Sequence, residues 1–199
     1  MFLKLAGRKC LVIGAGRIAE PKIESLLHAD ADIRVVAPQA TRKVAAHARA
    51  GRIVWETREF TANDLDDVFL VVAATNSPGV NHEIFRESRH RNILCNAVDD
   101  PEHCDFYYPA VVRRGHLQIA ISTAGQSPSL AQRLRKELEQ QFGPEYENWI
   151  EALGKARQEI MAEALSPRRR KSLLHQLASR DPFKSKTRGR SVAHTRRTS

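Results

Sequence analysis

The stretch that decides the fold of this 199-residue chain is KCLVIGAGRIA, residues 9–19. A short apolar run ends at Gly14, and Gly16 and Ala19 follow in the spacing G-x-G-x-x-A. In dinucleotide-binding turns the first glycine allows a tight bend, and the second lets a pyrophosphate approach the backbone. The small third residue packs the following helix against the strand. The pattern predicts nucleotide binding, and the alternative is a glycine turn with a structural role only.

The segments that follow continue this alternation of strands and helices. Strands are expected at 33–37, 52–55, 69–74 and 93–98, and helices at 40–50 and 79–90. The run at 69–74 is the most apolar, as a central parallel strand should be. These repeats predict an α/β fold with a Rossmann-type parallel sheet.

After residue 99 the pattern changes. Two strand-like runs at 107–112 and 117–121 flank a turn at 113–116, which predicts a hairpin. Amphipathic helices are then expected at 128–142 and 145–164, with Pro167 ending the second and a short helix at 171–179. The last part of the chain has too little apolar content to fold.

Composition and charge narrow the class of protein. Hydrophobic residues make up 42% and charged residues 28%, which is typical of a globular protein. No apolar run is long enough to span a bilayer, and the N-terminus has no signal-peptide pattern, so we expect a cytoplasmic protein without membrane contact. The net charge of +9 arises in the tail, because residues 166–199 hold eleven Lys or Arg and one acid, Asp181. The body is close to neutral, which argues against a nucleic-acid-binding fold.

Three cysteines lie far apart in the sequence, at positions 10, 95 and 104. Their spacing fits neither a disulfide framework nor a zinc motif. Cys10 and Cys95 fall in apolar strands, so we expect them to be small buried side chains.

Polar residues at the carboxyl ends of the predicted strands are candidates for ligand binding. Thr75 and Asn76 follow the strand at 69–74, where capping of the next helix is an equally good explanation. The strand at 33–37 is followed by Gln39, without the usual acidic residue. Gln39 suits a ribose hydroxyl, whereas Arg42 and Lys43 suit a 2′-phosphate, so these residues leave NAD and NADP both open.

A carboxylate follows the strand at 93–98. Asp99 lies on the same predicted edge as the glycine turn, where it could act as a general base, or it could simply cap an Asp-Pro turn. His103, Cys104 and Asp105 offer suitable metal-ligand types. Because neighbours in sequence do not face one another, no preformed metal site is predicted there.

Taken in order, several motifs carry a family resemblance. They are GAGRIA at 14–19 with Lys22, AATN at 73–76, NAVD at 96–99, FYYPA at 106–110 and AISTAGQSP at 120–128 with Leu130. This set, over residues 2–142, resembles the precorrin-2 dehydrogenase family, which includes the N-terminal part of multifunctional siroheme synthases. The block at 120–128 is its most distinctive part.

The resemblance implies a homodimer that oxidises precorrin-2 to sirohydrochlorin with NAD, and some family members also insert ferrous iron. It implies a Rossmann domain at 1–112, a dimerisation and substrate region at 113–142 and a small helical region at 143–180. From its composition, and not from the resemblance, we expect a basic tail without ordered structure at 181–199.

The resemblance also assigns site residues. Asp99 takes the family's catalytic position, and the residues that contact NAD are Arg17, Ile18, Gln39 and Ala40. Basic groups for the substrate carboxylates are expected at Lys22, Arg113 and Arg114. Ser122 and Thr123 are expected at the substrate, and Thr123 replaces a serine that some members phosphorylate. Ala15 and Ala124 replace glycines, which is tolerable where the backbone φ is not positive.

Two other readings compete with the enzyme. A non-catalytic NAD-sensing module would need neither Asp99 nor the block at 120–128, so their presence argues against it. A nucleic-acid binder would rest on the tail alone, so removal of 181–199 would abolish its function.

Overall fold

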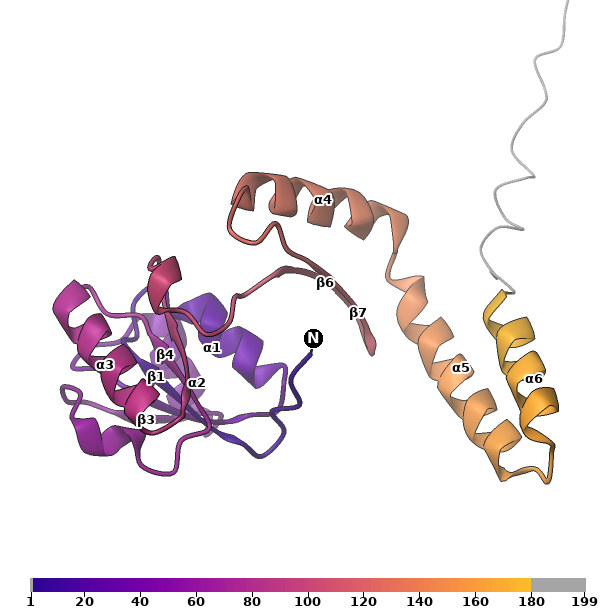
Figure 1. Ribbon diagram of the computed structural model, residues 1–199, viewed down its shortest axis with the longest axis horizontal. Coiled ribbons are helices and arrows are strands. Elements are labelled where there is room, and N and C mark those ends of the chain that lie inside the picture. The colour runs from indigo at the N-terminus through magenta and orange to yellow at the C-terminus, as the bar shows by residue number, and fades with distance from the viewer. Residues whose placement is uncertain (1, 180–199) are drawn as a thin grey trace, which may run out of the picture. The chain divides into compact units, whose positions relative to one another are not determined.

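The computed structural model describes residues 2–179, which form two compact units that divide between Tyr108 and Pro109 (Figure 1). The sequence placed the end of the first domain at residue 112, within the strand that opens the second unit. The finer divisions at 142 and 180 stay predictions. The tail at 181–199 lies outside the described residues.

The first unit is a five-stranded parallel sheet in the order β3-β2-β1-β4-β5. Its strands are β1 (Lys9–Ile13), β2 (Asp32–Val36), β3 (Val54–Glu56), β4 (Leu70–Ala73) and β5 (Leu94–Ala97). The helices are α1 (Glu20–Leu27), α2 (Arg42–Arg49) and α3 (Pro78–His90), with short 3₁₀ turns η1 (Ala62–Leu65) and η2 (Pro101–His103). This confirms the α/β fold with a Rossmann-type sheet.

Both faces of the sheet are buried, which explains why its central strands are apolar without interruption. Side chains alternate along β1, so Cys10 and Val12 pack in the core on the α1 and α2 side. Leu11 and Ile13 pack with Ile84 of α3 in a second core on the opposite face. The expectation that Cys10 and Cys95 are buried is confirmed.

An ion-pair network around the buried carboxylate of Asp64 ties β2 and the residues after β3 to η1. Asp64 is 3% exposed and accepts hydrogen bonds from Arg34 at 3.1 Å and from Arg58 at 2.6 and 2.8 Å. The backbone N–H of Thr61 also donates to the Asp64 carboxylate, at 2.8 Å. Burial by itself would raise the pKa of Asp64, but the hydrogen bonds from Arg58 and Thr61 outweigh it and hold the pKa at about 2.

The second unit begins with an antiparallel hairpin of β6 (Ala110–Arg114) and β7 (Leu117–Ile121). Its strands differ from the prediction, because β6 begins after Pro109 and includes Arg113 and Arg114. The turn is therefore only Gly115-His116, and Gly115 has a φ of +54°. Helices α4 (Pro128–Gln141), α5 (Glu145–Ala162) and α6 (Pro167–Ser179) follow.

The end of α5 and the start of α6 correct the predicted boundaries. The sequence placed one helix at 145–164 with Pro167 after it, and another at 171–179. The structure ends α5 at Ala162 and uses Pro167 to open α6. Proline suits the first turn of a helix because the N–H it lacks has no partner there. Within the described residues, no helix is long and apolar enough to cross a bilayer.

Candidate active site

The glycine turn lies between the ends of β1 and β4. Gly14 has a φ of +101°, and a Cβ atom at this position would lie 2.3 Å from the carbonyl oxygen of Ala74. A side chain is therefore excluded twice, by the backbone conformation and by the neighbouring strand end. Ala15 has no positive φ, so its replacement of a glycine is tolerated as expected.

Gly16 has a different environment. A Cβ atom here would meet no atom within 4 Å, so the space beside its backbone is open. Among the described residues, the backbone N–H groups of residues 16–18 donate no hydrogen bond within the protein. Free N–H groups before the first turn of α1 are the donors that a pyrophosphate requires.

A cavity of about 880 Å³ opens at this carboxyl edge of the sheet. It is lined by the glycine turn, by the residues after β2 and by the residues after β4. Six predicted cofactor residues line it: Gly14, Gly16, Gln39, Ala40, Thr75 and Asn76. The other two, Arg17 and Ile18, are exposed and do not line it, and Ile18 is 51% exposed.

The residues after β4 have two roles, because they cap α3 and also line the cavity. Ser77, rather than Thr75 or Asn76, is the N-cap of α3, with its hydroxyl accepting from the N–H of Val80. Thr75 Oγ1 lies 2.7 Å from Oδ1 of Asn81 and accepts from the N–H of Ser77. Asn81 is a nearly buried polar residue that sequence reasoning missed, and its position on an amphipathic helix gave no signal of this role.

The residues after β2 that line the cavity include no basic side chain. Lys43, one of the two candidates for a 2′-phosphate, forms an ion pair with Glu24 on α1. Arg42 is exposed and does not line the cavity. Glu59 lines it, from the loop that the Asp64 network anchors. Sequence reasoning missed Glu59 because it searched for an acid directly after β2.

The loop after β5 carries Asp99. The N–H of Val98 donates to the carbonyl of Ala73 at 2.9 Å, so this loop leaves the sheet beside the end of β4. Asp99 is exposed and has a φ of +63°, a conformation that aspartate tolerates better than most residues. No hydrogen bond involves its carboxylate among the described residues, so capping of the turn does not account for it.

The rest of this loop is held by its own polar side chains. Buried Asn96 donates to the carbonyl of Phe106 at 2.7 Å, and Asp105 accepts from the N–H of Cys95 at 3.0 Å. The Cys104 thiol donates to the carbonyl of Ala97 at 3.1 Å, and burial raises its pKa. Asp105 and Cys104 therefore have structural contacts, and neither points to a shared ligand with its neighbour His103.

Lys22 lies on α1 close to this loop. Its ammonium stands 4.1 Å from the centre of the Tyr108 ring, in a cation–π contact. Burial lowers the pKa of Lys22, and the nearby charge of Asp99 partly opposes that shift. The candidate catalytic carboxylate and one predicted substrate cation are therefore neighbours in the first unit.

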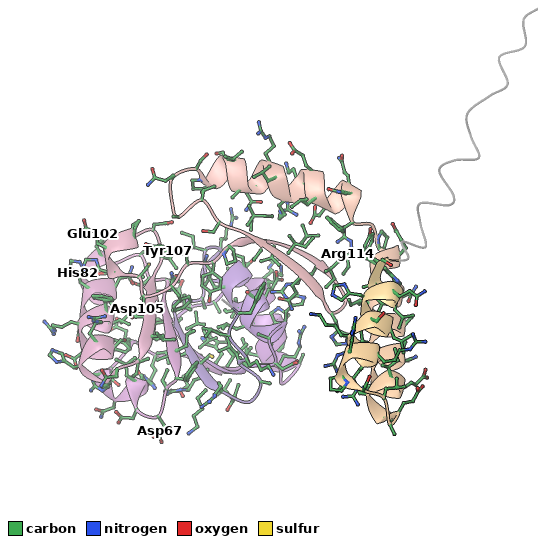
Figure 2. The ribbon with its side chains drawn as sticks, turned by 45° about the vertical axis from the view of Figure 1, so that its right-hand side comes forward. Asp67, His82, Glu102, Asp105, Tyr107 and Arg114 are labelled. Atoms are coloured by element: carbon green, nitrogen blue, oxygen red, sulfur yellow. The ribbon has the colours of Figure 1, made fainter. Side chains whose placement is uncertain are left out.

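The remaining predicted substrate residues lie in the second unit. Arg113 is half-buried on β6. Arg114, by contrast, donates to the backbone carbonyls of Phe142 at 2.8 Å, Glu139 at 3.0 Å and Arg113 at 2.8 Å. Figure 2 shows Arg114 where the hairpin meets the helices of this unit. Its guanidinium joins these elements, so it is not a free group for a substrate carboxylate.

The block after β7 forms a hydroxyl-capped turn. Ser122 Oγ accepts from the N–H of Ala124, and Thr123 Oγ1 accepts from the N–H of Ser127, both at 3.1 Å. Each hydroxyl keeps its own hydrogen to donate elsewhere. Ala124 has a φ of +49°, so this replacement of glycine is strained, contrary to the condition under which the sequence made it tolerable.

Comparison with known proteins agrees with this arrangement. A family model described as "Putative NAD(P)-binding" matches residues 1–110, and one described as "Sirohaem biosynthesis protein central" matches residues 114–141. The siroheme synthase of Photorhabdus laumondii is 37% identical over 176 residues, which is 88% of this chain and 37% of that protein. Siroheme synthase 1 of Yersinia enterocolitica is 42% identical over 139 residues, 70% of this chain and 29% of that protein.

The chain thus spans only about a third of the length of these curated relatives. A solved structure, that of SirC, precorrin-2 dehydrogenase, matches almost end to end. It has a TM-score of 0.77 and 30% identity, over 89% of this chain and 87% of that one.

Proposed function

Because the chain belongs to the family of precorrin-2 dehydrogenases and siroheme synthase N-terminal regions, we propose that it oxidises precorrin-2 to sirohydrochlorin with NAD as the hydride acceptor. The observation that carries this proposal is the juxtaposition at one sheet edge. A nucleotide-sized cavity lined by the glycine turn opens there, and the loop with the uncommitted carboxylate of Asp99 leaves the sheet from the neighbouring strand.

The residues of the first unit fit a dinucleotide. The open backbone at Gly16 and the free N–H groups of residues 16–18 suit the pyrophosphate. Gln39 lies in the cavity with a side chain that can hydrogen-bond a ribose hydroxyl. NAD, when bound, supplies the hydride acceptor.

The charges around the cavity favour NAD over NADP. Glu59 lines the cavity, and a carboxylate there repels a 2′-phosphate. Lys43, which would attract that phosphate, is engaged by Glu24. Arg42 remains exposed, but it does not line the cavity.

Asp99 is our candidate for the proton that leaves when the hydride is removed. Its carboxylate has no hydrogen-bond partner among the described residues, and it is exposed where a macrocycle could reach it. Lys22 beside it supplies a positive charge for one of the substrate's carboxylates. Arg113, Ser122 and Thr123 of the second unit are proposed substrate residues on the family resemblance alone, while Arg114 is left out because backbone carbonyls hold its guanidinium.

We further propose a homodimer built on the second unit. A two-stranded hairpin rarely supports a stable core without further packing. The apolar residues Leu117, Ile119 and Ile121 of β7 are only half-buried, and Leu130 of α4 is 38% exposed. A second copy of the chain, as the family implies, would cover these side chains. Sedimentation analysis would show twice the mass of the monomer, and a monomer at micromolar concentration would contradict this part of the proposal.

The test of the reaction is an anaerobic absorbance assay with precorrin-2 and NAD, in the absence of metal. The sirohydrochlorin spectrum should appear only when NAD is present, and addition of ferrous iron to the same cuvette then tests metal insertion. An unchanged spectrum despite measurable NAD binding would contradict the enzyme and favour the sensing module.

Asp99→Asn tests the proton acceptor within this assay. General-base catalysis contributes about 100-fold or more, so we expect a loss of kcat of at least about that size with NAD affinity unchanged. The matched control is Asp67→Asn, because Asp67 is also exposed with a φ of +60°. Asp67 follows η1 and precedes β4, which places it at the opposite edge of the sheet (Figure 2). Equal activity in the two variants would exclude Asp99 as the base.

A further inference from the structure

We infer that His82, Asp100 and His103 form a binding site for a divalent transition-metal ion with nitrogen and oxygen ligands, of the class of Fe²⁺, Co²⁺ or Zn²⁺. The site lies in the first unit and outside the nucleotide cavity. It is separate from the proposed oxidation, because none of these side chains has a part in that reaction.

The three side chains come from elements that the sequence keeps apart. His82 lies on the first turns of α3, whereas Asp100 and His103 frame η2 after β5. Their ligand atoms lie within 4.8 Å of one another. Figure 2 labels His82 on α3 and Glu102, the neighbour of His103, on η2 at the same end of this unit. The pairing of α3 with η2 therefore assembles the cluster.

The distances suit a metal ion. His82 Nε2 lies 3.2 Å from His103 Nδ1 and 3.9 Å from Asp100 Oδ2, and His103 Nδ1 lies 2.7 Å from Asp100 Oδ2. Ligand bonds of about 2.0–2.1 Å in tetrahedral geometry place neighbouring ligand atoms roughly 3.3 Å apart. The three observed separations bracket that value, so small side-chain adjustments would complete the geometry.

Without a cation, the cluster does not satisfy its own lone pairs. If Nδ1 of His103 carries a hydrogen, that hydrogen goes to Asp100, and none is left for the lone pair of His82 Nε2. If Nδ1 of His103 carries none, its lone pair faces the carboxylate oxygen at 2.7 Å. A metal ion at the common point accepts all three lone pairs at once. Two imidazoles and one carboxylate are also the ligand set of open mononuclear iron sites.

The surroundings hold and expose the site. The His103 ring packs edge-on against Phe85, with ring centres 4.8 Å apart, which fixes its orientation. His82 is 60% exposed at a cavity of about 700 Å³, so an ion can enter and keep open positions for water. Two arginines at this cavity are paired with carboxylates, Arg86 with Glu87 and Arg89 with Asp105, which limits their repulsion of a cation.

The test is titration of the full chain, free of any affinity tag, with Co²⁺ followed by visible absorbance and by calorimetry. NAD and tetrapyrrole are left out, so this result is independent of the dehydrogenase assay. We expect one Co²⁺ per chain and a d–d spectrum typical of nitrogen and oxygen ligands. His82→Ala should weaken binding at least about tenfold, because it removes a ligand without removing a buried side chain.

Two control variants test whether the loss of Co²⁺ binding is specific to the three residues of the cluster. His90→Ala removes another exposed histidine of α3 that lines the same cavity but lies outside the cluster, and it should leave binding unchanged. Cys104→Ser should also leave the spectrum unchanged, because its thiol donates to backbone carbonyls. Asp100→Asn should weaken binding like His82→Ala. Absence of Co²⁺ binding, equal losses in His82→Ala and His90→Ala, or a thiolate charge-transfer band lost in Cys104→Ser would each overturn the inference.

Discussion

Replacing Gly14 and Gly16 by alanine, one at a time, separates the two roles of the glycine turn. The two residues are two positions apart, and both belong to the predicted nucleotide site. Yet a Cβ atom at Gly14 would lie 2.3 Å from the Ala74 oxygen and 2.7 Å from its carbonyl carbon, whereas at Gly16 it would meet nothing within 4 Å. One substitution should therefore damage the fold, and the other only the binding of NAD.

The magnitudes follow from these contacts. At Gly14, alanine is held at a φ of +101°, which costs about 1–3 kcal/mol for a residue with a side chain. Overpacking against the end of β4 adds about 1–3 kcal/mol. We expect the free energy of unfolding of the first unit to fall by roughly 2–6 kcal/mol. Gly16 has no positive φ, so alanine there should leave stability unchanged or raise it by up to about 1 kcal/mol.

The assay is urea unfolding followed by tryptophan fluorescence. The chain has two tryptophans, Trp55 in the first unit and Trp149 in the second. A Trp149→Phe background leaves Trp55 as the reporter, and its indole N–H donates to the carbonyl of Ala37 near the cavity. NAD affinity is measured separately by calorimetry, where Gly16→Ala should bind at least about tenfold more weakly because its methyl group occupies the pyrophosphate position.

Either of two results would refute this reasoning. A Gly14→Ala protein within about 0.5 kcal/mol of the parent would show that the end of β4 yields at little cost. A Gly16→Ala protein with unchanged NAD affinity would show that the pyrophosphate does not approach the turn at this position.

Three more predictions concern pH, cofactor choice and the tail. Because folding lowers the pKa of Asp64 from 3.8 to about 2, its stabilisation of about 2 kcal/mol is complete above about pH 5 and is lost as the pH falls towards 2. The difference in urea stability between the parent and Asp64→Asn should shrink over that range, and a constant difference would contradict the role of ionisation. Glu59→Gln should raise NADP affinity relative to NAD about fivefold in calorimetry, since it removes about 1 kcal/mol of repulsion. Asp67→Asn, which removes an exposed carboxylate at the opposite edge of the sheet, serves as the control. Removal of residues 181–199 should leave dehydrogenase activity near that of the full chain, and a large loss would favour a function carried by the tail.

Much of the first unit could be predicted because its signals are local. The apolar strands, the glycine spacing and the change of pattern after residue 99 each depend on a few consecutive residues. The carboxyl ends of parallel strands share one edge, so the sequence also placed Gln39, Thr75 and the Asp99 loop at that edge. Six of the eight cofactor residues predicted from these patterns or from the family resemblance line one cavity, although their contact with NAD stays a proposal.

The errors in the second unit have local physical causes. Pro167 was taken as the end of a helix, but proline terminates one helix and opens the next equally well. Alanine at position 124 was judged tolerable on the condition that its φ is not positive, and the hydroxyl-capped turn at 122–127 does not meet that condition. Arg114 was a candidate for binding a substrate carboxylate. In the structure the C-terminal end of α4 lies close enough for its backbone carbonyls to accept hydrogen bonds from Arg114.

The sequence alone therefore determined the sheet, the nucleotide turn and the family, because strand periodicity, glycine chemistry and ordered motifs are written in neighbouring residues. Only the tertiary structure decided that Glu59 reaches the cavity, that Lys43 is engaged by Glu24 and that His82 meets His103. These contacts join side chains from different elements. Their geometry depends on how the helices pack on the sheet and on the conformations of the loops. It therefore cannot be predicted from the spacing of these residues in the sequence.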